Sequence, residues 1–117
     1  MTVTAIPSRV VWVDVCPIDV IVPGRGVCAL VDGRQVAIFR VDGELYALSN
    51  FDPFSRAFVL SRGIVGSRGD RLKVASPVYK QNFDLRTGQC LDDAAVVVPT
   101  FAVRAVDGRV EVAVAPA

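Results

Sequence analysis

The sequence predicts an all-β domain built from short antiparallel strands. Valine, whose β-branched side chain packs well on a pleated surface, accounts for 23 of the 117 residues. Asp-Gly pairs at 32–33, 42–43 and 107–108 each separate two apolar runs, and both residues tolerate the positive φ of a tight hairpin turn. No window of about 15 residues sustains the 3.6-residue period of an amphipathic helix.

The strands follow from these signals in chain order. A dense apolar run at 10–15 is expected to be the first strand, and Cys16-Pro17 ends it. The Pro- and Gly-containing residues 17–26 are expected to be a loop with a short extended piece at 20–22. Residues 61–70 are expected to be a Gly- and Arg-rich connection, before apolar alternation returns at 71–75. The three hairpins pair 27–31 with 35–41, 35–41 with 44–49, and 101–106 with 109–114.

One short helix is expected near residues 53–58. Asp52 offers an N-cap side chain, and Pro53 would occupy the first helical position, where its missing N–H costs nothing. The helix would end before Gly63.

Length and charge limit the possible partners. The size fits one domain at 10–114, with a flexible N-terminus at 1–9 and a loose tail at 115–117. Thirteen basic against twelve acidic residues leave a net charge of +1, which argues against nucleic acid or an anionic membrane as the main partner. No apolar run is long enough to span a bilayer.

The cysteines and the N-terminus predict a cytoplasmic location. Cys16, Cys28 and Cys90 are widely spaced and odd in number, which suits free thiols, each expected to be a small buried hydrophobe. A reactive thiol at Cys90 is the alternative. The N-terminus lacks the basic start, apolar run and cleavage site of a secretory signal.

The chain lacks the residues of common catalytic sites. It contains no histidine, so acid–base chemistry at neutral pH would need a carboxylate, Lys, Tyr or Cys with a shifted pKa. Neither Gly24-x-Gly26 nor Gly63-x-x-Gly66 has the spacing of a nucleotide-binding loop. No catalytic and no cofactor-binding residue is therefore predicted.

One pair of adjacent segments carries a family resemblance: Ser76-Pro77-Val78-Tyr79, followed by Phe83-Asp84-Leu85-Arg86-Thr87-Gly88. It resembles the second half of a Rieske iron–sulfur domain, whose cluster is held by Cys-x-His and Cys-x-x-His pairs. Asp52-Pro53-Phe54 stands at the first ligand loop, and Pro99 and the last hairpin complete the order. The resemblance implies a Rieske-like antiparallel β-sandwich with a smaller subdomain that carries the two loops.

All four ligand positions of that family are changed. Asp52 and Phe54 stand in the first loop, and Ser76 and Tyr79 in the second. Ser and Tyr are poor substitutes for thiolate and imidazole donors, and Phe is none. The resemblance therefore implies that this chain holds no iron–sulfur cluster and no metal.

Three segments narrow the resemblance to one branch. Residues 50–55, 60–66 and 76–84 resemble the small subunits of assimilatory NAD(P)H-dependent nitrite reductases. Membership implies a cytoplasmic enzyme that reduces nitrite to ammonia in nitrate assimilation, with FAD, sirohaem and an iron–sulfur cluster on its large subunit. This chain would be a non-catalytic accessory subunit that docks to or stabilises the large subunit.

The residues of the two loops leave alternatives open. Phe54 and Tyr79 either fill the space of the missing cluster or form an aromatic docking patch. Asp52 is expected to cap the helix, and Ser76 to bond local backbone in a turn. The arginines are either a solvated face or partners for acidic groups on a larger subunit: Arg56, Arg62, Arg68 and Arg71.

The partner interface is expected at six residues of these loops: Phe54, Ser55, Arg56, Arg62, Tyr79 and Lys80. Two other functions remain possible on the same scaffold. The chain could be a stand-alone regulatory or metabolite-binding module, or an independent redox or hydrolytic enzyme.

Overall fold

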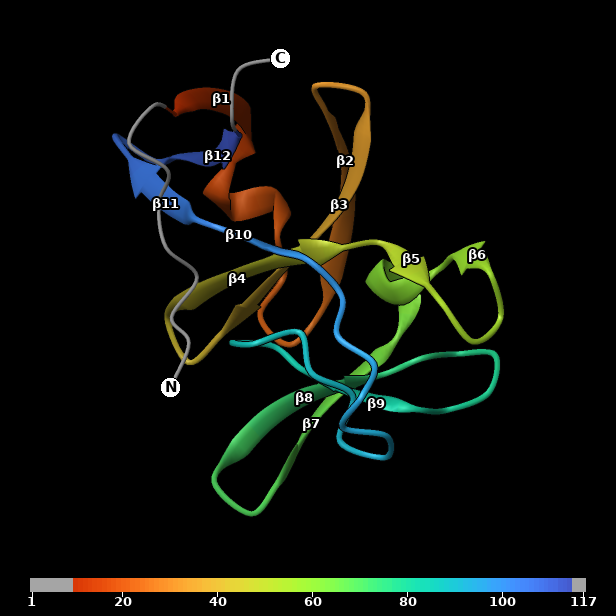
Figure 1. Cartoon of the computed structure of the whole chain (residues 1–117). Helices are drawn as coiled ribbons and strands as arrows, with labels where there is room; N and C mark the ends of the chain where they lie inside the picture. Colours follow the sequence, from red (N-terminus) through yellow and green to blue (C-terminus); the bar gives the residue numbers. More distant parts are fainter. Residues whose placement is uncertain (1–9, 115–117) are drawn as a thin grey trace.

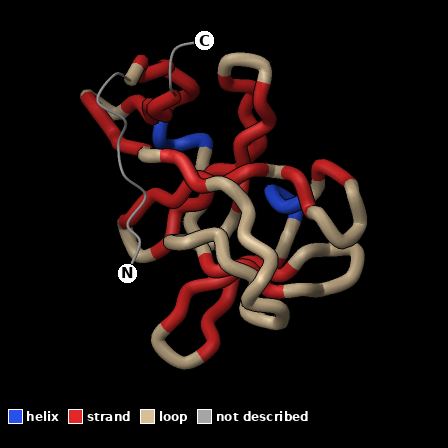
Figure 2. The backbone as a smooth tube through the Cα atoms, viewed as in Figure 1, coloured by secondary structure: helices blue, strands red, loops and turns tan. Residues whose placement is uncertain are grey.

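The computed structural model describes residues 10–114, and strands dominate them (Figures 1 and 2). The expected flexible N-terminus at 1–9 and tail at 115–117 lie outside the described residues. The elements are β1 (Val11–Pro17), η1 (Ile18–Val20), β2 (Gly26–Val31), β3 (Arg34–Val41), β4 (Glu44–Ser49), β5 (Phe51–Asp52), β6 (Ala57–Phe58), η2 (Leu60–Arg62), β7 (Ile64–Arg68), β8 (Arg71–Ala75), β9 (Asn82–Asp84), β10 (Thr100–Phe101), β11 (Val103–Val106) and β12 (Arg109–Val114).

Two sheets form the larger part of the molecule, in the orders β1-β12-β11 and β10-β4-β3-β2. The chain passes from one sheet to the other at Ala102, because β10 pairs with β4 while β11 pairs with β12. A cluster of apolar residues fills the space between the sheets: Ile21, Val31, Val36, Ile38, Ala47, Val110, Val112 and Val114. The predicted antiparallel β-sandwich is confirmed.

The smaller part of the molecule is a subdomain made of the β5-β6 pair and the β7-β8-β9 sheet. Figure 1 shows these strands together at one side of the larger sheets. A second core packs the subdomain against β3 and β4: Ala37, Phe39, Leu48, Leu60, Val74, Phe83, Leu85, Cys90 and Val98.

Strand β3 joins the two cores. Its side chains alternate between opposite faces, so Val36 and Ile38 enter the first core while Ala37 and Phe39 enter the second. All four residues from 36 to 39 are 0% exposed, which explains why this segment is apolar without alternation. The position of the subdomain is therefore fixed by a strand that the larger sheet also needs.

The three Asp-Gly turns are confirmed, but the strand expected at 101–106 is divided: Phe101 pairs with β4, and only Val103–Val106 pairs with β12. Val31 pairs with Arg34, Val41 with Glu44 and Val106 with Arg109, which leaves two-residue loops. Each loop has positive φ at both residues, at 51–52° for Asp and 77–79° for Gly, as a type I′ turn requires. A fourth hairpin, which joins β7 to β8 through Gly69-Asp70, was not predicted and was taken as part of a connection.

The helix expected near residues 53–58 is wrong. Residues 53–56 form the turn of the β5-β6 hairpin, in which Phe51 pairs with Phe58 and Asp52 with Ala57. The backbone N–H of Arg56 donates to the carbonyl of Asp52 at 2.7 Å, and a positive φ of 59° at Arg56 stops a helix from continuing. The helical turn lies later, at η2.

Two smaller expectations also change. Strand β1 continues through Cys16-Pro17, where the sequence predicted its end. The extended piece expected at 20–22 is not a strand: Val20 ends the 3₁₀ turn η1, and its C-cap residue Ile21, which has an extended backbone, is fully buried in the first core.

Gly88 provides a test of this packing. It has a φ of 77°, and a Cβ there would collide with the backbone carbonyl of Val98. We expect Gly88→Ala to lower the free energy of unfolding by about 3 kcal/mol, because the backbone strain and the collision add. Urea denaturation measures the loss.

Gly108 is the matched control, because its φ of 78° is nearly the same and nothing lies within 4 Å of an added Cβ. Gly108→Ala should cost only the conformational strain, about 1 kcal/mol. Equal losses in the two variants would show that the contact with Val98 contributes nothing.

Candidate functional site

The candidate site lies where two loops of the subdomain meet. The first loop is residues 53–56, between β5 and β6, and the second is residues 76–81, between β8 and β9. Figure 1 shows both loops extending toward the same end of the molecule. We call these two loops together the tip.

The carboxylate of Asp52 joins the two loops. Its side chain is 0% exposed. Oδ1 accepts the backbone N–H of Phe54 at 2.9 Å, and Oδ2 accepts the Ser55 hydroxyl at 2.9 Å and the Ser76 hydroxyl at 2.5 Å. The bond to Ser76 connects residues 24 apart in the sequence, so it fixes one loop against the other.

These donors determine the charge of Asp52. Burial raises the pKa of the Asp52 carboxyl, but the hydrogen bonds from Ser76, Phe54 and Ser55 lower it, and the net pKa lies below its ordinary value. The group is therefore a buried carboxylate at neutral pH. The expectation of a helix cap at Asp52 is wrong, although the side chain does cap the N-terminal end of a turn.

Ser76 makes the predicted local bond and a second bond that the sequence did not predict. Its hydroxyl accepts the backbone N–H of Val78 at 3.4 Å, which is the expected local turn bond. Its shorter bond to Asp52 was not predicted, because no local pattern links two loops so far apart.

The two aromatic residues of the site have different roles. Phe54 is partly buried and packs on Phe83 of the second core, with ring centroids 6.1 Å apart. Tyr79 is 62% exposed. The sequence left two alternatives open for both residues, space filling or an exposed aromatic patch. In the structure Phe54 fills space in the interior, whereas Tyr79 is exposed.

Asn50, two residues before Asp52, is a buried polar residue for which the sequence predicted no role. Its Oδ1 accepts the backbone N–H of Ser61 at 2.6 Å, and its Nδ2 donates to Gln35 Oε1 at 3.1 Å. Asn50 therefore ties η2 to β3. The signal in the sequence was its place in the segment 50–55, which carries part of the family resemblance.

The Phe-Asp-x-x-Thr-Gly segment has a structural explanation. Phe83 is fully buried, and Asp84 Oδ1 accepts the backbone N–H groups of Arg86 and Thr87 at 2.7 and 3.1 Å. Gly88 then turns the chain at positive φ beside Val98. The segment shapes the turn that leads into the second core.

The four arginines left open by the sequence fall into two pairs. Arg68 forms an ion pair with Asp92 at 3.1 Å, and Arg71 lies 3.6 Å from the carboxylate of Asp84. Arg56 and Arg62 are exposed and have no ion pair among residues 10–114. Arg56 and Arg62 therefore differ from Arg68 and Arg71 in lacking an acidic partner within the described residues.

The donors at the tip do not fit a Rieske cluster. The two positions of the Cys ligands hold Asp52 and Ser76, which bond to each other, and the two positions of the His ligands hold Phe54 and Tyr79. Within residues 10–114, no group of three or more Cys, Asp or Glu side chains is placed to hold a metal ion.

Comparison with known proteins places the chain in a family. The model of the Rieske-like [2Fe-2S] domain matches residues 11–113. The nitrite reductase (NADH) small subunit of Salmonella typhimurium is 47% identical over 102 residues, which cover 86% of this chain and 94% of that one. The chain belongs to the nitrite reductase small-subunit family.

A solved structure and a longer relative extend the comparison. The crystal structure of an NADH-dependent nitrite reductase small subunit from Mycobacterium tuberculosis superposes with a TM-score of 0.89 at 50% identity, covering 94% of this chain and 100% of that one. The nitrite reductase [NAD(P)H] large subunit of Klebsiella oxytoca is 41% identical over 106 residues, which are 91% of this chain but 11% of that one. A small-subunit domain thus matches part of a much longer chain.

The thiols of this small-subunit family member are divided between core and surface. Cys90 is 1% exposed, which confirms the expected buried hydrophobe there, whereas Cys28 is exposed and Cys16 is half-buried. Partial burial raises the pKa of the Cys28 thiol, and the nearby Arg62 guanidinium offsets this only in part. Cys28 is therefore protonated at neutral pH, the less reactive form.

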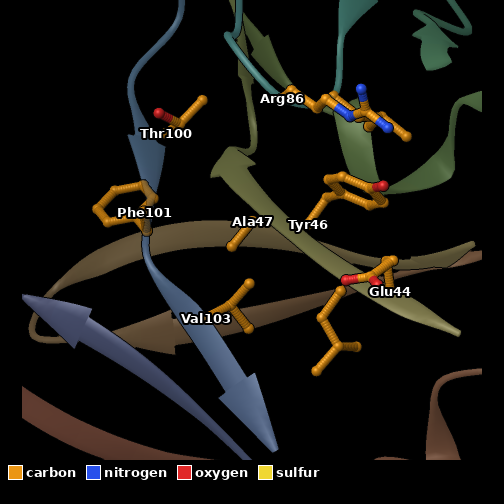
Figure 3. Close-up of a pocket in the computed structure, with 9 residues that line it drawn as sticks. Glu44, Tyr46, Ala47, Arg86, Thr100, Phe101 and Val103 are labelled. Carbon is orange, nitrogen blue, oxygen red and sulfur yellow. The ribbon is translucent and has the colours of Figure 1, made fainter. Parts of the chain in front are cut away.

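A pocket of about 430 Å³ lies away from the tip, against β4, β10 and β11 (Figure 3). Glu44, Tyr46, Arg86 and Thr100 are its polar residues, and none of the four residues at the ligand positions lines it. The helical segments among residues 10–114 are three-residue turns, far too short to cross a bilayer.

The lowered pKa of Asp52 predicts a pH-dependent stability. A carboxyl with a lower pKa in the folded state stabilises the fold above its unfolded pKa, about 3.9, and loses this contribution as pH falls through the folded value. Asp52→Asn removes the titrating group. We expect the difference in unfolding free energy between the wild type and Asp52→Asn to shrink as pH falls from 6 to 2.5.

Urea denaturation at several pH values measures that difference. A difference that stays constant across the range would show that the hydrogen bonds do not favour the ionised form of Asp52.

The two hydroxyl donors to Asp52 can be compared directly. Ser76 is 1% exposed, whereas Ser55 is partly exposed, so water can replace only the Ser55 hydroxyl. We expect Ser76→Ala to cost about 2 kcal/mol, the usual cost of losing a hydrogen bond to a buried charge, and Ser55→Ala to cost about 1 kcal/mol or less. Equal costs would contradict the bridging role of Ser76.

Proposed function

We propose that the chain is the small subunit of an NAD(P)H-dependent nitrite reductase and that it acts by docking its tip onto the large subunit. The geometry of the tip carries the proposal. The Asp52–Ser76 bond keeps the two loops together without any metal, and Tyr79 stands exposed beside them. A fixed, partly aromatic surface of this kind suits a protein interface.

The reaction itself belongs to the large subunit in this proposal. The large subunit would carry FAD, sirohaem and an iron–sulfur cluster and reduce nitrite to ammonia in the cytoplasm. The chain described here would carry no cluster, because its donors are a carboxylate and a hydroxyl bonded to each other, with two aromatic rings. Its contribution would be assembly and stability of the complex.

The longer relative supports contact between the two subunits. Its match to 91% of this chain lies within a sequence named as the large subunit of nitrite reductase. A domain that occurs both alone and within the longer chain is expected to lie against the rest of that chain. Association would then stabilise both components by mass action.

The six expected contact residues remain the proposed interface: Phe54, Ser55, Arg56, Arg62, Tyr79 and Lys80. Phe54 and Tyr79 are not equally suitable for mutation, because only Phe54 packs on the core. Phe54 packs on Phe83, so its removal would disturb the core as well as the surface. Tyr79 is exposed enough to be removed without that effect.

Tyr79→Ala tests the proposal. Truncating a central aromatic contact typically weakens a complex by about 2 kcal/mol, so we expect about a 30-fold rise in the Kd for the purified large subunit. Isothermal titration or biolayer interferometry measures the affinity, and thermal melting of the isolated chain should show little change.

Val106→Ala is the control, because Val106 is 40% exposed at the β11-β12 turn, outside the tip. It should bind like the wild type. Wild-type affinity in Tyr79→Ala, or an equal loss in Val106→Ala, would place the interface elsewhere.

A further inference from the structure

Two residues of the tip have an unusual backbone conformation. Five non-glycine residues among the described part of the chain have positive φ, and three of them are the Asp residues of the Asp-Gly turns. The other two are Arg56 and Lys80, at 59° and 63°, one in each loop of the tip. Long side chains are disfavoured there, and Gly or Asn is the usual choice.

The fold gives no reason for a cation at either position. Both side chains are exposed, and within residues 10–114 neither has a hydrogen bond or ion pair. Other arginines do have acidic partners: Arg68, Arg71, Arg104 and Arg109. Strain at a position where the exposed side chain has no hydrogen bond or ion pair within residues 10–114 points to a role outside the chain.

The loops hold the two cations in defined places. The N–H of Arg56 donates to the carbonyl of Asp52 at 2.7 Å, and the N–H of Ser76 donates to the carbonyl of Gln81 at 2.9 Å, which closes the second loop around Lys80. The Asp52–Ser76 bond then fixes one loop against the other. Both cations are thus presented from a single preorganised surface.

The exposed charged side chains within the two loops are both positive, and the carboxylate of Asp52 between the loops is buried. Residues 53–62 and 76–81 contain no Asp or Glu, and Arg62 adds a third exposed cation at the end of η2. Such a surface attracts a negatively charged partner and repels a basic one.

We propose that Arg56 and Lys80 bind a carboxylate-rich surface of the large subunit, in the same interface as Tyr79. This inference rests on the proposed docking function and adds the chemistry of the partner. The cations would steer the approach and set the orientation, while Tyr79 would supply apolar burial.

The double variant Arg56→Gly/Lys80→Gly separates charge from stability. Glycine accepts positive φ without steric cost, so the melting temperature of the double variant should stay within about 3 °C of the wild-type value or rise. We expect the Kd for the purified large subunit to rise on the order of tenfold at about 0.05 M salt. The dependence of the Kd on salt should also become shallower than in the wild type.

The control variant Arg40→Gln/Arg86→Gln removes the same charge outside the tip: Arg40 lies in β3, and Arg86 lines the pocket of Figure 3. It should keep wild-type affinity. If Arg56→Gly/Lys80→Gly melts at a much lower temperature, Arg56→Asn/Lys80→Asn takes its place, because Asn also tolerates positive φ.

The outcomes distinguish the two proposals. Suppose that the double variant keeps wild-type affinity and salt dependence while Tyr79→Ala binds weakly. This result would overturn the inference of a carboxylate-rich partner surface, but docking through the tip would still stand. An equal loss in the control variant would also overturn it, since net charge alone would then be the cause. No binding by the wild-type chain would overturn the docking proposal and this inference with it.

Discussion

The arrangement of the tip depends on one buried carboxylate. Asp52 has no exposed surface, and an ionised group in that position is tolerated only if hydrogen-bond donors surround it. The donors come from both loops, from Phe54 and Ser55 in the first and from Ser76 in the second. Satisfying this single charge therefore brings two segments together that are distant in the sequence, and the positions of Arg56 and Lys80 follow from it.

The same two loops have a different connection in a cluster-binding Rieske domain. There, two Cys and two His ligands tie the loops to iron. In this chain the two Cys positions hold the bonded pair Asp52 and Ser76, while Phe54 takes one His position and packs inward on Phe83. The scaffold around them is kept rigid by β3, which is buried on both faces. In this chain the two loops are thus held by hydrogen bonds and packing among protein groups.

Much of the fold could be predicted because its signals are local. Each Asp-Gly pair determines a two-residue turn and hence the register of its hairpin. The segment from Phe83 to Gly88, which carries part of the family resemblance, contains a turn built on Asp84. The prediction of a helix near 53–58 was wrong because its local signal is ambiguous: Asp-Pro favours both a helix start and a tight turn. The pairing of Phe51 with Phe58 decides for the turn.

The sequence by itself determined the all-β class, the hairpin registers, the family, and the lack of imidazole and paired thiolate donors. Each of these features depends on residue types or on residues that are neighbours in the chain. Only the tertiary structure decided that Asp52 bonds Ser76, that Phe54 turns inward while Tyr79 stays exposed, and that Arg68 is paired while Arg56 is free. These outcomes depend on contacts between residues far apart in the sequence. No local pattern encodes such contacts, since they arise only when the two cores bring the loops together.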